Sequence, residues 1–170
     1  MAREVVIFPH PALRKVCDPV HTFDAELRQL VEEMFEAMHR APGVGLAAPQ
    51  VDVPRRVLVV DISIGQDPGS TRTLINPEIL ATNGSTVAMD EGCLSFPGMN
   101  IEIDRPEGVT VRFQTVEGEP VEEEASGLLA RVYQHEIDHL DGVLYFDHLS
   151  VIKRELFKKE YKRILNQRER

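Results

Sequence analysis

The first clear hydrophobic pattern in the chain runs from Ala25 to Met38, where apolar residues recur at steps of three and four. This spacing places them on one face of an α-helix, so the segment predicts a helix with one buried side. Asp24 and Glu26 suit its positive N-terminal end, and Pro42-Gly43 should end it. The apolar positions are Leu27, Leu30, Val31, Met34, Phe35 and Met38.

The middle third of the chain has the pattern of short strands and turns. Asn83-Gly84 favours a tight hairpin turn, and Glu117-Gly118 predicts a second turn. Gly43 to Gln50 fits neither a helical nor a strand period and predicts a close-packed loop, and Gly65 to Ser70 predicts a mobile surface loop. The predicted strands are Arg56 to Ile62, Leu74 to Ile75, Ile79 to Ala81, Thr86 to Met89, Ile101 to Ile103 and Val109 to Thr115. Short strands without intervening helices favour antiparallel sheets and an α+β fold.

A second helix is predicted from about Gly127 to Asp141. Ser126 can cap its start, and Gly142 stands where a helix would end. One face of this helix carries two histidines in line with apolar residues. The stripe consists of Leu128, Val132, His135 and His139.

A third helix is predicted from about Ser150 to Asn166, with an apolar side that should dock on the rest of the domain. Residues 151–170 contain eight Lys or Arg and three Glu, although the whole chain has a net charge of −9. The tail is therefore basic on an otherwise acidic chain. The apolar side consists of Ile152, Leu156, Phe157, Tyr161, Ile164 and Leu165. The basic residues are Lys153, Arg154, Lys158, Lys159, Lys162, Arg163, Arg168 and Arg170.

The composition limits the class of protein. A chain of 170 residues, 42% hydrophobic and 28% charged, predicts one globular domain over residues 1–170. The negative net charge argues against a nucleic-acid binder that uses its whole surface. No apolar run approaches the roughly 18 residues of a membrane span, and two cysteines are weak evidence for a disulfide, so we expect the reducing cytoplasm and no membrane partner. Cys17 is interpreted as a small buried hydrophobic residue.

The segment His135-Glu136-Ile137-Asp138-His139 is an H-E-x-x-H motif on a predicted helix. Four residues make just over one helical turn, so both imidazoles project the same way. A metal can bridge them, with Glu136 beside its open coordination position. The alternative interpretation is a buried helix with two hydrogen-bonded core histidines.

A catalytic metal of this type needs a third protein ligand. One class of H-E-x-x-H hydrolase uses a histidine six residues after the second one, and Tyr145 at that position excludes this class. Another class uses a downstream glutamate, for which Glu155 and Glu160 are candidates, although acids on an amphipathic helix are more often solvated. Cys93 is the better candidate, because a thiolate binds Zn(II) or Fe(II) strongly and Gly92 would let the backbone pass close to a metal.

Three segments, Gly43 to Gln50, Glu91 to Ser95 and Gln134 to Leu140, together resemble the peptide deformylase family in order and spacing. The length and the three-helix plan resemble the bacterial form throughout. The resemblance implies a metal-dependent hydrolase that removes the N-formyl group from the N-terminal formyl-methionine of nascent polypeptides and releases formate. It also implies antiparallel sheets around a central metal-binding helix, with an N-terminal helix and a C-terminal amphipathic helix.

The resemblance also implies roles for individual residues. Glu136 would take a proton from the attacking water and pass it to the departing amine. Gln50 and the backbone N–H of Leu94 would donate hydrogen bonds to the oxyanion. The implied metal ligands are Cys93, His135 and His139.

The substrate needs its own contacts beside the metal. Gly45 fills the position where the substrate backbone is expected to approach, and the nascent peptide could add along this loop as a strand. An apolar pocket must accept the methionine side chain. Leu128 and Val132 lie on the histidine stripe and are candidates for it, and Val44 and Met89 are weaker ones. Core packing is the alternative role for each of them.

The remaining expectations concern the metal, partners and alternatives. The three ligands suit Fe(II), Zn(II), Ni(II) and Co(II), and the resemblance favours Fe(II) in cells. In related bacterial enzymes the basic helix is thought to bind the ribosome. Two other functions stay open: a zinc peptidase with Glu155 or Glu160 as third ligand, and a non-catalytic ribosome-associated module with a structural metal. We also expect an ion pair between Glu91 and Arg105 that holds the Cys93 segment.

Overall fold

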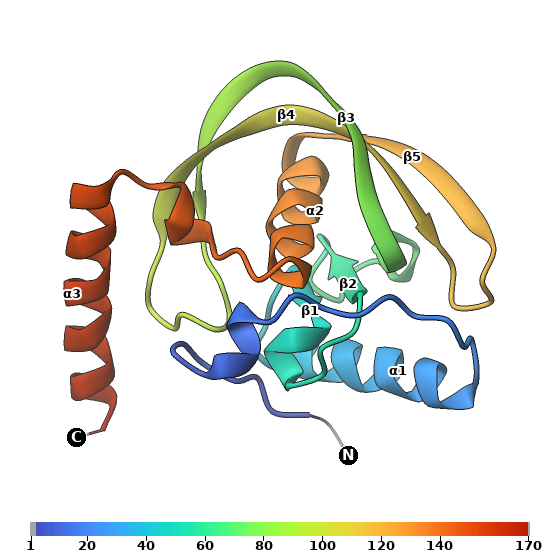
Figure 1. The fold of residues 1–170 in the computed structure, drawn as a ribbon, viewed down its shortest axis with the longest axis horizontal. Helices are drawn as coiled ribbons and strands as arrows, with labels where there is room; N and C mark the ends of the chain where they lie inside the picture. Colours follow the sequence, from blue (N-terminus) through green and yellow to red (C-terminus); the bar gives the residue numbers. More distant parts are fainter. Residues whose placement is uncertain (1–2, 170) are drawn as a thin grey trace.

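The structure is a computed structural model that describes residues 3–169, so Arg170 of the basic tail lies outside the described residues. A five-stranded antiparallel sheet, in the order β1-β2-β3-β4-β5, frames the molecule (Figure 1). The strands are β1 (Gly45–Ala47), β2 (Val57–Asp61), β3 (Thr71–Glu91), β4 (Ile101–Gln114) and β5 (Pro120–Ser126). The helices are α1 (Ala25–Arg40), α2 (Gly127–Leu140) and α3 (Val151–Arg168), with short 3-10 helices η1 (Pro11–Arg14), η2 (Ala48–Val51), η3 (Pro68–Ser70) and η4 (Tyr145–His148). The predicted α+β class is confirmed.

Helix α2 lies at the centre, beneath the arch formed by the long strands β3 and β4 (Figure 1). Its inner face packs with β2 and β4 into one hydrophobic cluster, and α1 packs with β1 and β2 into a second. The Asp24 side chain accepts a hydrogen bond from Leu27 N at 3.0 Å and so caps α1, as its sequence predicts. The sheet and the first cluster therefore hold α2 in the interior.

The predicted turn at Asn83-Gly84 is wrong. Strand β3 continues through this dipeptide, and Asn83 pairs with Gly108 of β4. The register shifts between Asn83 and Thr86, where Gly84 has φ +74°, so the dipeptide forms an irregularity within the strand. The three short strands predicted from Leu74 to Met89 are therefore one strand. Residues 92–100 connect β3 to β4 instead.

Two strands of the sheet were not predicted. The segment from Gly43 to Gln50 contains the edge strand β1 and the helix η2, so the loop prediction is wrong there. Strand β5 carries three consecutive glutamates, and charged residues on an edge strand hide the usual strand pattern. The predicted turn at Glu117-Gly118 is confirmed, because Gly118 N donates to Thr115 O at 2.9 Å.

Helix α3 stands at the outer edge of the molecule, beyond η4 (Figure 1). Only Phe157 and Tyr161 are buried among its described residues, and they pack against Phe96 with ring centroids at 5.5 and 5.2 Å. Ile152 and Leu156 are 75% and 62% exposed, so the prediction that the whole apolar side docks is wrong at the start of the helix. The aromatic cluster contacts only the later turns. No helix in residues 3–169 has both the length and the apolar character needed to cross a membrane.

Candidate active site

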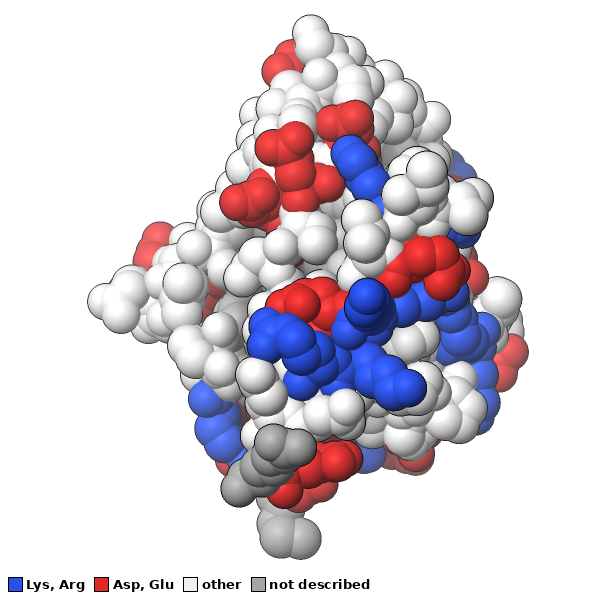
Figure 2. All heavy atoms as spheres, turned by 90° about the vertical axis from the view of Figure 1, so that its left-hand side faces the viewer, with Lys and Arg blue, Asp and Glu red and all other residues white. Residues whose placement is uncertain are grey.

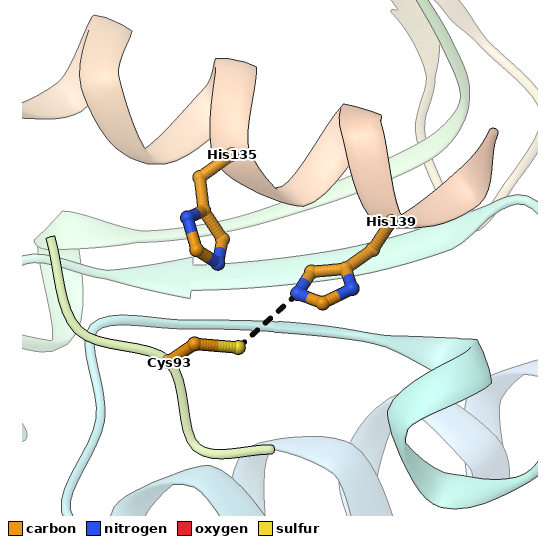
Figure 3. A group of neighbouring side chains, drawn as sticks. All are labelled: Cys93, His135 and His139. Carbon is orange, nitrogen blue, oxygen red and sulfur yellow. Dashed lines mark hydrogen bonds between the residues drawn. The ribbon is translucent and has the colours of Figure 1, made fainter. Parts of the chain in front are cut away.

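The structure brings Cys93, His135 and His139 together, although Cys93 lies more than forty positions before the two histidines (Figure 3). Cys93 lies on the β3–β4 connection and the histidines on α2, and one potential ligand atom from each lies within 4.8 Å of the others. Cys93 Sγ is 3.4 Å from His139 Nε2. A tetrahedral metal with ordinary bond lengths separates a sulfur and a nitrogen ligand by about 3.5 Å. The donor set and its spacing therefore fit one metal ion.

Glu91 orients the first histidine. Its Oε1 accepts a hydrogen bond from His135 Nδ1 at 2.8 Å, which leaves the lone pair of Nε2 free for a metal. Arg105 donates to both oxygens of Glu91 at 2.6 and 3.0 Å, so the predicted ion pair is confirmed. Burial opposes ionisation of Glu91, but His135 and Arg105 outweigh it and hold its pKa well below the usual range. The Glu91 carboxylate therefore stays ionised and accepts the hydrogen bond from His135, beside the group formed by Cys93, His135 and His139.

The sequence analysis missed Arg131. This buried side chain donates from Nη1 to Glu91 Oε2 at 2.8 Å and to Ile103 O at 2.6 Å, and from Nη2 to Val87 O at 2.6 Å. Arg131 lies one helical turn before His135, and that i to i+4 relation to a metal-binding candidate was the available signal. It ties α2 to both β3 and β4.

Glu136 is only 5% exposed, and within residues 3–169 its Oε2 has no hydrogen-bond partner. Burial raises the pKa of this carboxyl to about 7. A group with a pKa near neutrality can both accept and donate a proton. Glu136 and the neighbouring His135 on α2 line the same cavity.

The pKa values of the two histidines shift in opposite directions. Burial opposes charging of His135, but contacts with Cys93 and Glu91 raise its pKa well above its ordinary value. Burial and the neighbouring His135 lower the pKa of His139. His139 Nδ1 has no partner among the described residues. A neutral imidazole at His139 keeps a lone pair for a metal.

Gln50 and Leu94 border the cluster. Gln50 is buried in η2, where its Oε1 accepts from Ala47 N at 2.9 Å. Its Nε2 donates to Ser95 Oγ at 3.1 Å and to Cys93 Sγ at 3.6 Å. Within the described chain, the backbone N–H of Leu94 makes no hydrogen bond. Gln50 Nε2 therefore lies beside the sulfur, and Leu94 directly follows Cys93 in the chain.

A cavity of about 550 Å³ opens beside the cluster. Its lining includes four predicted substrate-binding residues together with Cys93, His135 and Glu136. The four are Val44, Gly45, Leu128 and Val132. A Cβ atom on Gly45 would lie 2.7 Å from Val132 and 2.9 Å from Glu136 Oε1, so only glycine fits there. Met89 does not line this cavity; it lines a second one of about 420 Å³.

The rival third ligands lie far from this cluster. Glu155 and Glu160 are on α3 with side chains 69% and 47% exposed, where they pair with Lys158 and Arg163. Neither belongs to the group of potential metal ligands found among the described residues. The zinc-peptidase alternative that depends on them is therefore wrong.

The chain is similar to known proteins over almost its whole length. Residues 2–155 match the family model for polypeptide deformylase. A peptide deformylase from Phenylobacterium zucineum is 48% identical over 161 residues, 95% of each chain, and one from Hahella chejuensis is 48% identical over 92% of each chain. The crystal structure of a peptide deformylase from Legionella pneumophila superposes with a TM-score of 0.93 at 39% identity, over 100% of this chain and 99% of that one. The chain belongs to the polypeptide deformylase family.

Proposed function

We propose that Cys93, His135 and His139 hold one divalent metal ion at which this chain carries out its family's reaction. As a member of the family, the chain is a metal-dependent hydrolase that removes the formyl group from nascent polypeptides and releases formate. The observation that carries the proposal is the three ligand atoms within 4.8 Å, beside a buried Glu136 oxygen without a partner. Bound there, a metal supplies a Lewis acid and an activated water.

Glu136 is the general base and then the general acid. Its carboxyl, with a pKa of about 7, accepts a proton from the attacking water and passes it to the amine nitrogen as the formyl C–N bond breaks. Glu91 acts through His135. Its hydrogen bond fixes the tautomer and the orientation of that ring.

Gln50 and Leu94 stabilise the developing oxyanion. Gln50 Nε2 is already turned toward Cys93 Sγ, and Gln50 Oε1 is held by Ala47 N, so the amide cannot rotate freely. The free N–H of Leu94 adds a second donor. Rigid donors of this kind stabilise a transition state without reorganising.

The methionine side chain enters the cavity lined by Val44, Leu128 and Val132. The backbone of the nascent peptide lies along β1, which pairs with β2 on one side and is an edge of the sheet on the other. Main-chain hydrogen bonds along such an edge do not depend on the sequence of the added strand. One site can therefore process many different proteins.

The native metal is Fe(II), and the test starts from anaerobically purified protein. We expect it to contain about one iron per chain and to release formate from a formyl-methionyl peptide. Cys93→Ser should lose both, whereas Cys17→Ser, with its thiol buried elsewhere, should keep both. Metal retention and full activity in Cys93→Ser would refute the proposed cluster. A thiolate ligand also suits the reducing cytoplasm, where nascent chains are made.

The basic face of α3 binds ribosomal RNA near the emerging peptide. Lys and Arg side chains gather on the side of the molecule formed by α3 (Figure 2), and Lys153, Lys159, Lys162 and Arg168 are exposed on it. Such a patch suits phosphate groups and predicts binding that weakens with salt.

Charge reversal tests this contact. Lys159→Glu with Lys162→Glu should weaken ribosome binding at least about tenfold and flatten its salt dependence. Lys15→Glu with Arg28→Glu changes the net charge equally at exposed positions off α3 and should bind like the wild type. Equal binding by both double variants would refute the assignment.

A further inference from the structure

Arg131 contacts two cavities. One is the cavity of about 550 Å³ beside the metal cluster, and the other is the cavity of about 420 Å³ lined by Met89. Of the described residues that line either cavity, only Arg131 lines both. Its side chain therefore lies where the first cavity meets the second.

The side chain of Arg131 is fixed in this position. Three hydrogen bonds attach its guanidinium to Glu91, to Ile103 O on β4 and to Val87 O on β3. Swinging it aside would leave a buried cation without its carboxylate partner, which is strongly unfavourable. The Arg131 side chain therefore stays between the two cavities.

The second cavity has a partly apolar lining that could accept an alkyl chain. Val87, Met89 and Pro106 give its lining an apolar part, beside the polar residues Asn83, Glu107 and Ser126. An alkyl chain longer than that of methionine could reach this apolar part only past the position of Arg131. In the native chain the Arg131 side chain fills that position, because it lines both cavities.

We propose that Arg131 sets the depth of the methionine pocket, so that it is a specificity-determining residue that excludes first side chains longer than methionine. The inference rests on the proposed placement of the methionine side chain beside Leu128 and Val132. It assigns to Arg131 a role distinct from its ion pair with Glu91.

The test compares two formyl peptides, one beginning with norleucine, which has the length of methionine, and one with 2-aminodecanoic acid, whose chain is four carbons longer. The native enzyme should prefer the norleucine peptide in kcat/KM by at least about a hundredfold. Arg131→Ala should reduce this ratio by about tenfold or more, chiefly through KM for the longer peptide. Arg131→Met fills nearly the same volume without the hydrogen bonds and should relax the ratio clearly less than Arg131→Ala does.

Damage to the Glu91 network alone would lower the rates for both peptides and leave their ratio unchanged, so the ratio separates the two roles. The proposal is overturned by a native ratio near one, which needs no variant to fold. An unchanged ratio in Arg131→Ala, or equal relaxation in Arg131→Met, also overturns it.

Leu128→Ala tests the proposed placement of the methionine side chain separately from the depth role of Arg131, because Leu128 lines the first cavity and not the second. If it lowers kcat/KM for the norleucine peptide while Arg131→Ala leaves the ratio unchanged, the pocket is placed correctly and only the depth role fails. If Leu128→Ala changes neither peptide, the pocket itself is misplaced and both fail.

Discussion

Helix α2 buries polar residues, whereas helix α3 exposes apolar ones. Ten of the 14 residues of α2 are buried, including five polar or charged ones, whereas α3 buries only Phe157 and Tyr161 among 18. On α3 the apolar side chains of Val151, Ile152 and Leu156 are exposed. Hydrophobicity alone would predict the reverse for the five buried polar residues of α2 and for these three exposed apolar residues of α3.

The difference follows from the partners that surround each helix. On α2 the buried polar groups have specific partners, such as Glu91 for His135 and Arg131. Burial is then tolerated, and the low dielectric strengthens each contact. Helix α3 packs against one aromatic cluster, through Phe157 and Tyr161. What a position contacts, more than its own polarity, decides its burial here.

The strongest test of the comparison is Glu136→Gln. The amide keeps the size of the buried side chain but cannot transfer the proton, so kcat should fall about 10²- to 10⁴-fold with metal content unchanged. Glu155→Gln makes the same change on exposed α3 and should leave kcat unaffected. Formate release measures both. Native activity in Glu136→Gln would end the general-base assignment.

Removing the Glu91 carboxylate tests whether partners hold α2 in place. Glu91→Ala leaves Arg105 and Arg131 buried without their shared acceptor, which should cost about 3–5 kcal/mol of unfolding free energy. The affinity for metal should fall about 10- to 100-fold, because His135 loses its hydrogen-bond partner. Denaturant unfolding and metal titration check the two parts. Unchanged metal retention would remove the orienting role.

On α3 the same logic predicts two very different apolar truncations. Phe157→Ala removes a buried ring that stacks on Phe146 and should destabilise the fold by about 3 kcal/mol. Ile152→Ala, at a side chain 75% exposed, should change stability by less than about 0.5 kcal/mol. Urea unfolding measures both. Similar losses in the two variants would contradict the shallow docking of this helix.

The smallest expected effect concerns Asp61 of β2, a buried carboxylate that also has specific hydrogen-bond partners. Burial opposes ionisation of Asp61, but hydrogen bonds from Ser63, His39 and Gly65 lower its pKa to about 2. The folded pKa lies below the unfolded value of about 3.9. The carboxylate therefore stabilises the fold above about pH 4, and this contribution is lost as the pH falls toward 2.

Asp61→Asn should therefore show a shallower loss of unfolding free energy between about pH 4 and pH 2 than the wild type. Asp52→Asn, at an exposed carboxyl, should keep the native slope. Thermal unfolding across this pH range measures the three slopes. Identical slopes in the wild type and Asp61→Asn would contradict the predicted role of Asp61.

The sequence was informative where chemistry is local and misleading where pairing is distant. His135 and His139 lie one turn apart, so a helix alone aligns them. Asn83-Gly84 has the local preference of a turn, yet pairing with β4 continues through it because the arch of β3 and β4 forms many contacts elsewhere. Strand choice depends on such tertiary context.

The sequence analysis missed strand β5 and Arg131 for related physical reasons. The glutamates of β5 alternate between the two faces of an edge strand, so no apolar period marks it. Arg131 looks like part of a solvated helix face, and only the position of Glu91 across the β3–β4 arch makes its burial favourable. Burial of a charge depends on a partner that sequence spacing does not show.

Gly45 couples two properties that are usually separable. Any side chain there would press on both Val132 and Glu136. The proposed peptide-binding edge and the proposed proton-transferring carboxyl therefore lie in direct contact at Gly45. If both proposals hold, a substitution that enlarges this residue to keep out a peptide-like inhibitor also displaces Glu136, so resistance gained in this way comes with a loss of activity.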